Sequence, residues 1–350
     1  MRAPRGIPAA VLTVLFLIIW AAPSGGRSIH DQAGTGAFSF LRIGIGARAA
    51  AMGGAYVSLC EDASALYWNP AGLTQPDGQR LTLGYVNYLL DIQSGFLGYV
   101  LPPRGDLRLG AAITYFSYGE FQQTTVENPS GTGLGTFGAM DMALSISGAY
   151  PLEQGLSVGA SAKIIYSRIE EYSSDAYALD VGALYPLSNG RTRIGASIQN
   201  LGFQRRGYLT DHTDGLAPVF RLGASHRLQG LPLLLSADLF KPLDHHLNVN
   251  VGGEFLPIED VSFRLGWTSL GQDQKAGTDR DNLAGFSGGL GVGWQRYRLD
   301  YAYSSQAELG ACTGPPSRWI CEHPRIAFSS GGPSGPFFLP PAGRTGEAQG

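Results

Sequence analysis

Most of the chain consists of short segments in which apolar residues alternate with polar or small ones. Between residues 156 and 167, Leu156, Ala160 and Ile164 fall on one side of an extended chain, while Ser157 and Lys163 fall on the other. A period of two residues is typical of a β-strand. Thirteen such segments are centred near residues 85, 97, 112, 144, 162, 181, 196, 223, 236, 251, 266, 289 and 300. The pattern predicts an all-β, antiparallel protein.

The connections between these segments alternate in length along the chain. One set is short, at residues 102–106, 151–155, 187–191, 229–232, 257–260 and 295. The other set contains long loops at residues 119–137, 201–217 and 271–282. Outer-membrane barrels have short periplasmic turns and longer outer loops. We therefore expect every long loop at one end of a barrel and every tight turn at the other.

The two faces of the expected strands favour a membrane barrel over a soluble sandwich. The second face is mostly small and weakly polar, whereas a sandwich would expose a charged one. In lipid the sheet must close, because an open edge leaves backbone groups unsatisfied. We therefore predict a transmembrane, up-and-down β-barrel with thirteen recognisable strands. The apolar face carries aromatic residues near segment ends, as barrels do at both membrane interfaces: Tyr150, Tyr166, Tyr185, Phe255, Trp267, Trp294 and Tyr303.

The N-terminus has the features of a secretory signal peptide. Arg2 and Arg5 precede an apolar run over residues 9–22, and small residues follow it. The run is shorter than the ~20 residues of a membrane-spanning helix, although a signal anchor is the alternative. We assign residues 1–26 to the signal peptide and expect export to the outer membrane of a Gram-negative-type bacterium. A net charge of −3 does not indicate nucleic acid binding.

The segment before the first strand carries a recognisable motif. It contains Met52-Gly53-Gly54-Ala55-Tyr56, Glu61-Asp62-Ala63-Ser64-Ala65 and Asn69-Pro70-Ala71-Gly72. With these groups, residues 46–73 resemble the N-terminal segment of the PorV/PorQ family of outer-membrane proteins, which belongs to the FadL-like superfamily. The resemblance extends loosely over the strand region to Tyr303. It implies a fourteen-stranded barrel with the N-terminal segment folded inside as a plug.

Local physical chemistry agrees with a compact plug over residues 27–78. Gly53 and Gly54 permit positive φ and close backbone approach. Asp62 can cap a short helix over residues 63–67. Asn69 precedes a proline and is therefore pushed toward an extended conformation, which ends that helix. The barrel itself is assigned to residues 79–304.

Several charges lie on the small, polar face of the expected strands. They are Asp141, Lys163, Asp180, Arg193, Arg221, Arg227, Asp238, Glu254, Arg264 and Asp300. These side chains are expected to face the lumen, where they either form salt bridges alone or also fix the plug and line a path. We further expect Glu61 and Asp62 to meet lumen arginines such as Arg193 or Arg264.

Motifs for catalysis, cofactors and metals are weak in this sequence. Gly44, Gly46 and Ala49 match the G-x-G-x-x-A dinucleotide pattern, but that pattern needs a parallel βαβ unit rather than antiparallel hairpins. His245-His246 falls at a loop-to-strand junction and is interpreted as a surface pair rather than a metal site. No group of residues has zinc spacing. We expect no cofactor, no metal and no catalysis, although a Ser/His/Asp triad need not be local in sequence.

The C-terminal segment, residues 305–350, departs from the strand pattern. Seven prolines lie between residues 315 and 341, and proline is confined to sheet edges and bulges. The apolar stretches at residues 318–320 and 325–329 look too short to span a bilayer. We therefore expect the last strand to be missing or degenerate. The tail is expected to be disordered or to result from an altered reading frame after about residue 310, with a differently built last strand as the alternative.

Two functions remain open at this level. The family resemblance implies a non-catalytic component of protein secretion and surface attachment of the type IX kind, bound to outer-membrane lipid, secreted cargo and other secretion components. The alternative is a FadL-like transporter of long-chain fatty acids or other hydrophobic small molecules. A greasy pocket between plug and wall would favour transport, and exposed apolar outer loops would favour a protein partner.

Overall fold

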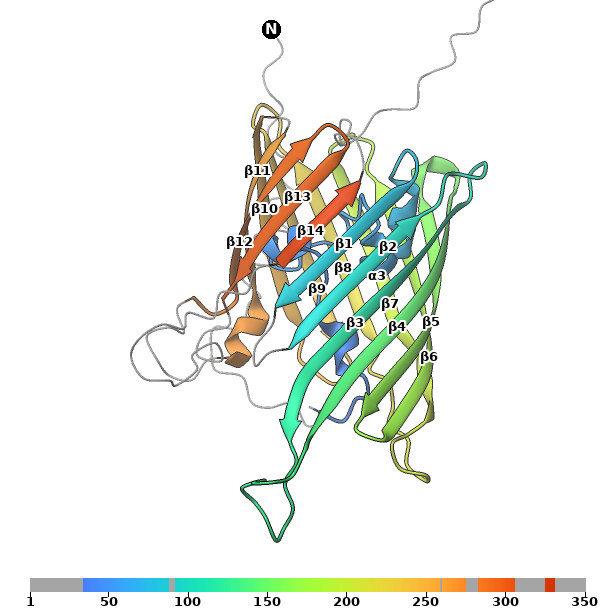
Figure 1. The fold of residues 1–350 in the computed structure, drawn as a ribbon. Coiled ribbons are helices and arrows are strands. Elements are labelled where there is room, and N and C mark those ends of the chain that lie inside the picture. The colour runs from blue at the N-terminus through green and yellow to red at the C-terminus, as the bar shows by residue number, and fades with distance from the viewer. Residues whose placement is uncertain (1–33, 88–91, 259, 275–282, 306–324, 331–350) are drawn as a thin grey trace, which may run out of the picture.

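A computed structural model of the protein describes residues 34–87, 92–258, 260–274, 283–305 and 325–330. The expected signal peptide and most of the expected tail lie outside the described residues. Fourteen strands form one closed, antiparallel barrel in which sequential neighbours pair and the last strand pairs with the first. Figure 1 shows the tilted strands surrounding a short N-terminal segment. The predicted fold is confirmed.

All thirteen predicted segments are strands, and each predicted centre lies within its strand. The strands are β1 (Arg80–Asn87), β2 (Gln93–Val100), β3 (Arg108–Gln122), β4 (Thr136–Pro151), β5 (Ser157–Ile169), β6 (Tyr172–Pro186), β7 (Thr192–Arg206), β8 (Val219–Arg227), β9 (Leu233–Pro242), β10 (Asn248–Ile258), β11 (Val261–Thr268), β12 (Phe286–Trp294), β13 (Tyr297–Ser304) and β14 (Arg325–Ser330).

The closing strand β14 corrects the expectation for the start of the tail. Its six residues pair with residues 297–302 of β13 on one side and residues 81–86 of β1 on the other. Residues 325–329 looked too short because their number was compared with the length of a strand that spans the bilayer by itself. Here β1 and β13 have only eight residues each, so six residues pair with most of both neighbours. The reading-frame hypothesis covers all residues after about 310, of which the structure describes only β14, and it stays untested.

The connections follow the predicted asymmetry only in part. The three long loops, now residues 123–135, 207–218 and 269–285, all lie at one end, which we call the outward end. The expectation that every tight turn lies at the other end is wrong. Strands β5 and β6 pair as far as Ile169 and Tyr172, which leaves a two-residue turn at the outward end. Pairing that continues to the strand ends leaves no residues for a loop.

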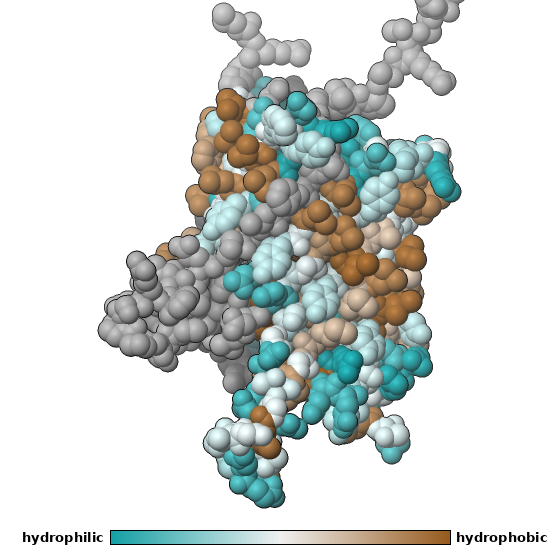
Figure 2. All heavy atoms as spheres, viewed as in Figure 1, coloured by the Kyte–Doolittle hydropathy of each residue, from teal (hydrophilic) through white to brown (hydrophobic). Residues whose placement is uncertain are grey.

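The wall alternates between an apolar outer face and a polar inner face. On β6, Leu179 is 57% exposed and the next residue, Asp180, is fully buried. Figure 2 shows apolar residues over the wall and hydrophilic ones gathered at the outward end. Val249 alternates with Asn250, which faces the plug, but it is buried beside the 3₁₀ helix η5 (Ser269–Gln274), where its N–H donates to Ser269 Oγ. No helix in the described part of the chain is long and apolar enough to cross a bilayer.

The N-terminal segment forms four short helical turns within the barrel, drawn in blue in Figure 1. They are η1 (Ser39–Arg42), α2 (Ala47–Ala51), α3 (Ala65–Trp68) and η2 (Pro70–Thr74). The helix predicted at residues 63–67 begins two residues later. Asn69 is extended and its side chain accepts the Ala71 N–H at the start of η2. Residues 34–78 are called the plug below, and their apolar side chains form most of the main buried cluster.

We predict that an arginine on the lipid face destabilises the barrel. Leu179→Arg should lower the free energy of unfolding by about 2–4 kcal/mol, because the middle of β6 faces the hydrocarbon layer. The matched change Leu231→Arg lies in the β8–β9 turn, where the side chain is 58% exposed, and should cost far less. Urea unfolding in lipid vesicles measures both. Equal losses would contradict the assigned orientation of β6.

Candidate functional site

Inward-facing glycines allow the plug backbone to touch the wall. A Cβ on Gly266 would lie 2.1 Å from Gly53 N of the plug, and one on Gly223 would lie 2.7 Å from the Val57 side chain of the plug. Gly53 has a φ of +66°, and its own added Cβ would meet the backbone of Trp267. Other wall glycines that contact the plug in this way are Gly159, Gly182, Gly195, Gly252 and Gly289. A side chain at these places would push the plug out of register with the wall.

Polar side chains of the wall bind the backbone of the plug around the barrel. Asp238 of β9 accepts from two plug N–H groups, those of Tyr56 at 2.7 Å and Val57 at 2.8 Å. Gln199 of β7 donates to two plug carbonyls at the end of α3. Asn250 of β10 and Ser287 of β12 each donate to one more carbonyl. In return, the motif residue Asn69 donates to the carbonyl of Ala183 on β6.

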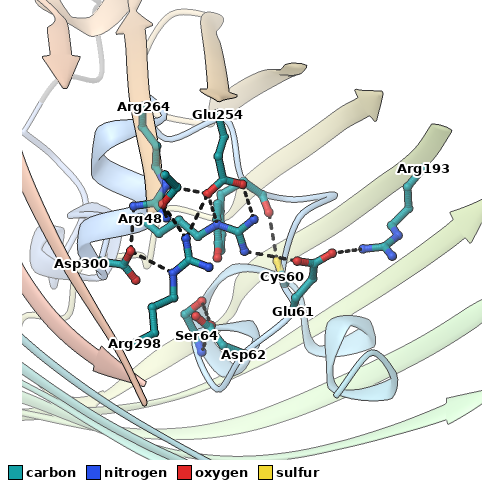
Figure 3. A network of polar contacts seen from close by, with 12 residues as sticks. Arg48, Cys60, Glu61, Asp62, Ser64, Arg193, Glu254, Arg264, Arg298 and Asp300 are labelled. Carbon is teal, nitrogen blue, oxygen red and sulfur yellow. Dashed lines mark hydrogen bonds and ion pairs between the residues drawn. The ribbon is translucent and has the colours of Figure 1, made fainter. Parts of the chain in front are cut away.

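A network of arginines and carboxylates joins the plug to the β10–β13 side of the wall (Figure 3). Arg48 of α2 forms two contacts with the Glu254 carboxylate, at 2.6 and 3.1 Å. Arg264 binds Glu254 and Asp300, each at 2.7 Å. Arg298 completes the group with weaker contacts to both carboxylates, at 3.4 and 3.1 Å. The buried Glu254 is therefore shared by three guanidinium groups, and Arg48 connects it to the plug.

Glu61 extends this network across the lumen to β7. Its carboxylate lies 3.3 Å from Arg48 and 3.3 Å from Arg193. Asp62 does not form the predicted ion pair with an arginine within the described residues. It accepts hydrogen bonds from the backbone N–H and hydroxyl of Ser64 instead, because it lies in the turn that leads into α3.

Two further predicted lumen charges form a separate pair in the wall. Lys163 Nζ of β5 lies 2.6 Å from Asp180 of β6 and donates to Asn200 Oδ1 of β7 at 2.9 Å. Asp180 also accepts the Asn200 N–H at an irregularity in the β6–β7 pairing, where Asn200 has a φ of +60°. This cluster stabilises a bulge and does not hold the plug.

Two members of the plug network were not among the predicted lumen charges. Arg298 shares the inward face of β13 with Asp300, so the period of two could have placed it there. Arg48 lies within the nucleotide-like pattern, between Gly46 and Ala49, and neither this pattern nor the Met52 motif assigns it a role. A positive charge surrounded by small residues in a plug needs a wall carboxylate, but its partner Glu254 is 206 residues away in the chain.

A chamber of about 420 Å³ opens toward the outward end beside the plug. Its lining combines apolar groups with a guanidinium, and includes Ile43, Trp68, Arg221, Phe240 and His245. Arg221 is 5% exposed and its guanidinium lies 4.8 Å from the Trp68 ring centre and 4.2 Å from the Phe240 ring centre. Its Nε donates to Gln199. No carboxylate of the described residues forms a direct ion pair with it, and Asp238 interacts with it only at longer range. The chamber therefore carries a positive charge without a direct ion-pair partner.

The plug and the wall leave little space between them on the β2–β5 side. The void lined by Phe40, Leu66, Phe96 and Lys163 measures only about 10 Å³, about the volume that one water molecule needs. The chamber at the outward end is therefore the larger space beside the plug.

Comparison with known proteins agrees with this geometry. Residues 27–228, more than half of the chain, match the family described as Type IX secretion system protein PorV. The chain belongs to the PorV family. It has the fold of the FadL-like channels and lies in the outer membrane. No curated protein matches the sequence.

Solved structures with a similar fold include two hydrocarbon channels. The TodX deltaS2S3 mutant monoaromatic hydrocarbon channel aligns with a TM-score of 0.57 and 15% identity, over 83% of this chain and 99% of that chain. The CymD monoaromatic hydrocarbon channel aligns with a TM-score of 0.55 and 13% identity, over 83% and 98%. At these identities the likeness concerns the fold alone.

We predict that Glu254→Gln loosens the plug. The change leaves Arg48, Arg264 and Arg298 without their shared carboxylate, and breaking a buried ion pair costs about 3–5 kcal/mol. The midpoint temperature of the heat-modifiable gel shift should fall clearly. The control Glu153→Gln, in the exposed β4–β5 turn, should leave it unchanged. Wild-type behaviour of Glu254→Gln would show that the network adds nothing to stability.

We predict that Cys60 reports on the position of the plug. Burial raises the pKa of its thiol well above the usual value, and the sulfur donates to the Tyr56 carbonyl at 3.0 Å, so little reactive thiolate is present. With Cys312 and Cys321 replaced by serine, the folded barrel should react with maleimide far more slowly than the urea-unfolded chain. Arg48→Met should accelerate the reaction. Fast labelling of the wild-type plug would contradict a fixed plug.

Proposed function

We propose that this barrel is a non-catalytic component of a type IX-like secretion and surface-attachment pathway, and that it binds cargo and partner proteins at its outward end. The observation that carries this proposal is the attachment of the plug. Wall strands β6, β7, β9, β10 and β12 all hydrogen-bond to it, and the Arg48–Glu254 pair adds a buried ionic contact. A plug held from so many strands is a fixed platform.

The alternative role in transport receives less support from the same geometry. A transporter of hydrophobic molecules would need an apolar passage between plug and wall. The void on the β2–β5 side measures about 10 Å³ and includes Lys163. Opening it would require the plug to break several buried hydrogen bonds, and each lost partner leaves a polar group unsatisfied at a cost of about 1–3 kcal/mol.

The chamber beside the plug suits a segment of a partner protein. Its apolar lining and the buried Arg221 favour an acidic group on an apolar chain, because a buried guanidinium is stabilised by charge-assisted hydrogen bonds. The β3–β4 hairpin extends beyond the barrel at the same end (Figure 1). Val126, at its tip, is 93% exposed. An exposed apolar residue on a long outer loop is consistent with a protein partner.

The test compares Arg221 variants in a deletion strain. Arg221→Gln should weaken capture of exported cargo from detergent-solubilised outer membranes about tenfold, since one charge-assisted hydrogen bond contributes about 1.5–3 kcal/mol. Arg221→Lys keeps the charge and should retain part of the binding. The control Arg191→Gln lies in the β6–β7 turn at the opposite end and should bind normally.

The same strains separate the two functions. Loss of secreted and surface-attached proteins in the deletion strain, with normal uptake of long-chain fatty acids, supports the secretion role. Normal secretion with impaired uptake would overturn it in favour of transport.

A further inference from the structure

A second pocket at the outward end lies on the other side of η1 from the Arg221 chamber. It measures about 440 Å³, within the range of small-molecule sites. The N-terminal residues 37–39 form one wall, and the ends of β3, β4 and β5 with the β7–β8 loop form the rest. Ser39 of η1 lines both pockets. The two spaces therefore share the outward mouth of the barrel but differ in their charges.

Asp141 of β4 is the buried charged group that lines this pocket, where Arg168 and Asp214 are the other charged residues of the lining. Its side chain is almost completely buried, at 7% exposed. Tyr118 donates its hydroxyl to Asp141 Oδ2 at 2.6 Å, and Ser167 donates its hydroxyl to Oδ1. Ser167 also contacts the hydroxyl of Tyr208. The carboxylate thus accepts hydrogen bonds from neutral hydroxyl groups only.

The surroundings of Asp141 differ from those of four other buried acidic side chains in the lumen. Asp180, Glu254 and Asp300 each pair with a lysine or arginine. Asp238 forms no ion pair within the described residues, but it accepts two backbone N–H groups of the plug. Asp141 forms no ion pair with any of the described lysine, arginine or histidine side chains. Arg168 lies on the outer, lipid-facing side of β5 and lines the rim of the pocket, where it donates to the carbonyl of Glu170. Buried charges are normally paired or bound to a cation, so this site lacks a positive group.

Aromatic rings surround the same space. Phe121 and Phe137 lie on adjacent strands with ring centres 5.6 Å apart, and Tyr118, Tyr208 and Phe38 complete the lining. Aromatic faces attract cations because of the negative potential above the ring. A carboxylate below several rings is the arrangement that binds organic ammonium groups.

We propose that the Asp141 pocket is a binding site for an organic ammonium group on an apolar stem, either a free amine or the lysine side chain of a partner. The ammonium would donate to Asp141, which retains free lone pairs, and the stem would contact Phe121 and Phe137. The site is separate from the Arg221 chamber and does not rest on the proposed secretion role.

The experiment uses the full-length barrel in dodecyl maltoside, a detergent without charge. Isothermal titration with benzylammonium should give saturable binding, while the neutral isostere benzyl alcohol should bind much more weakly. Asp141→Asn keeps the shape of the side chain and should weaken benzylammonium binding about tenfold or more. The weak affinity for benzyl alcohol should not change. Equal affinity for the two ligands, or no effect of Asp141→Asn, would overturn the proposal.

A second variant covers the case in which Asp141→Asn does not fold. Phe121 is 44% exposed near the end of β3, so Phe121→Ala should fold and should still reduce benzylammonium binding severalfold. Unchanged binding in this variant would place the ammonium elsewhere and overturn the proposal.

A last comparison distinguishes the sources of the ammonium group. The peptide acetyl-Gly-Lys-Gly-amide is titrated against its norleucine analogue. Preferential binding of the lysine peptide identifies a partner's side chain, whereas binding of benzylammonium alone identifies a free amine. Failure of both amines to bind would overturn the site but would leave the Arg221 test unaffected.

Discussion

A closed sheet of fourteen strands surrounds more space than its inward side chains can fill, and the plug occupies that space. Because the backbone turns of the plug approach the wall closely, the wall strands must lack side chains where the two meet. Glycines meet this need at Gly266 of β11, Gly252 of β10, Gly182 of β6 and Gly159 of β5. The excess of glycine in the sequence is therefore explained in part by close packing within the lumen.

An irregular plug also brings backbone groups into a space with little water. Asp238, Gln199 and Asn250 satisfy these groups from the wall, and the Glu254 network neutralises Arg48. These contacts fix the plug and so define the two pockets at the outward end. One contains Arg221 and the other contains Asp141, and neither of these two side chains forms an ion pair within the described residues. Both charges lie in pockets at the outward end of the barrel.

The strands could be predicted because one face of each contacts lipid, which requires apolar residues at every second position. The same alternation placed Asp180, Arg193, Glu254, Arg264 and Asp300 in the lumen. It could not predict β14, because strand closure depends on the length of its neighbours β1 and β13. Nor could it predict that Val249 is buried, since η5 covers that residue from a loop. The predicted arginine partner of Asp62 was wrong because the Asp62 carboxylate accepts hydrogen bonds from Ser64 in a local turn.

The sequence alone determined the barrel and the long loops at its outward end, since these follow from lipid contact. The plug was implied by the family resemblance of residues 46–73, and local backbone chemistry agreed with it. Only the tertiary structure decided which charges meet. Arg48 and Glu254 are 206 residues apart, and Arg221 lies between Trp68 of the plug and Phe240 of β9. Alternation assigns a side chain to a face of the sheet. Its partner across the lumen depends on how the plug is seated against the closed wall.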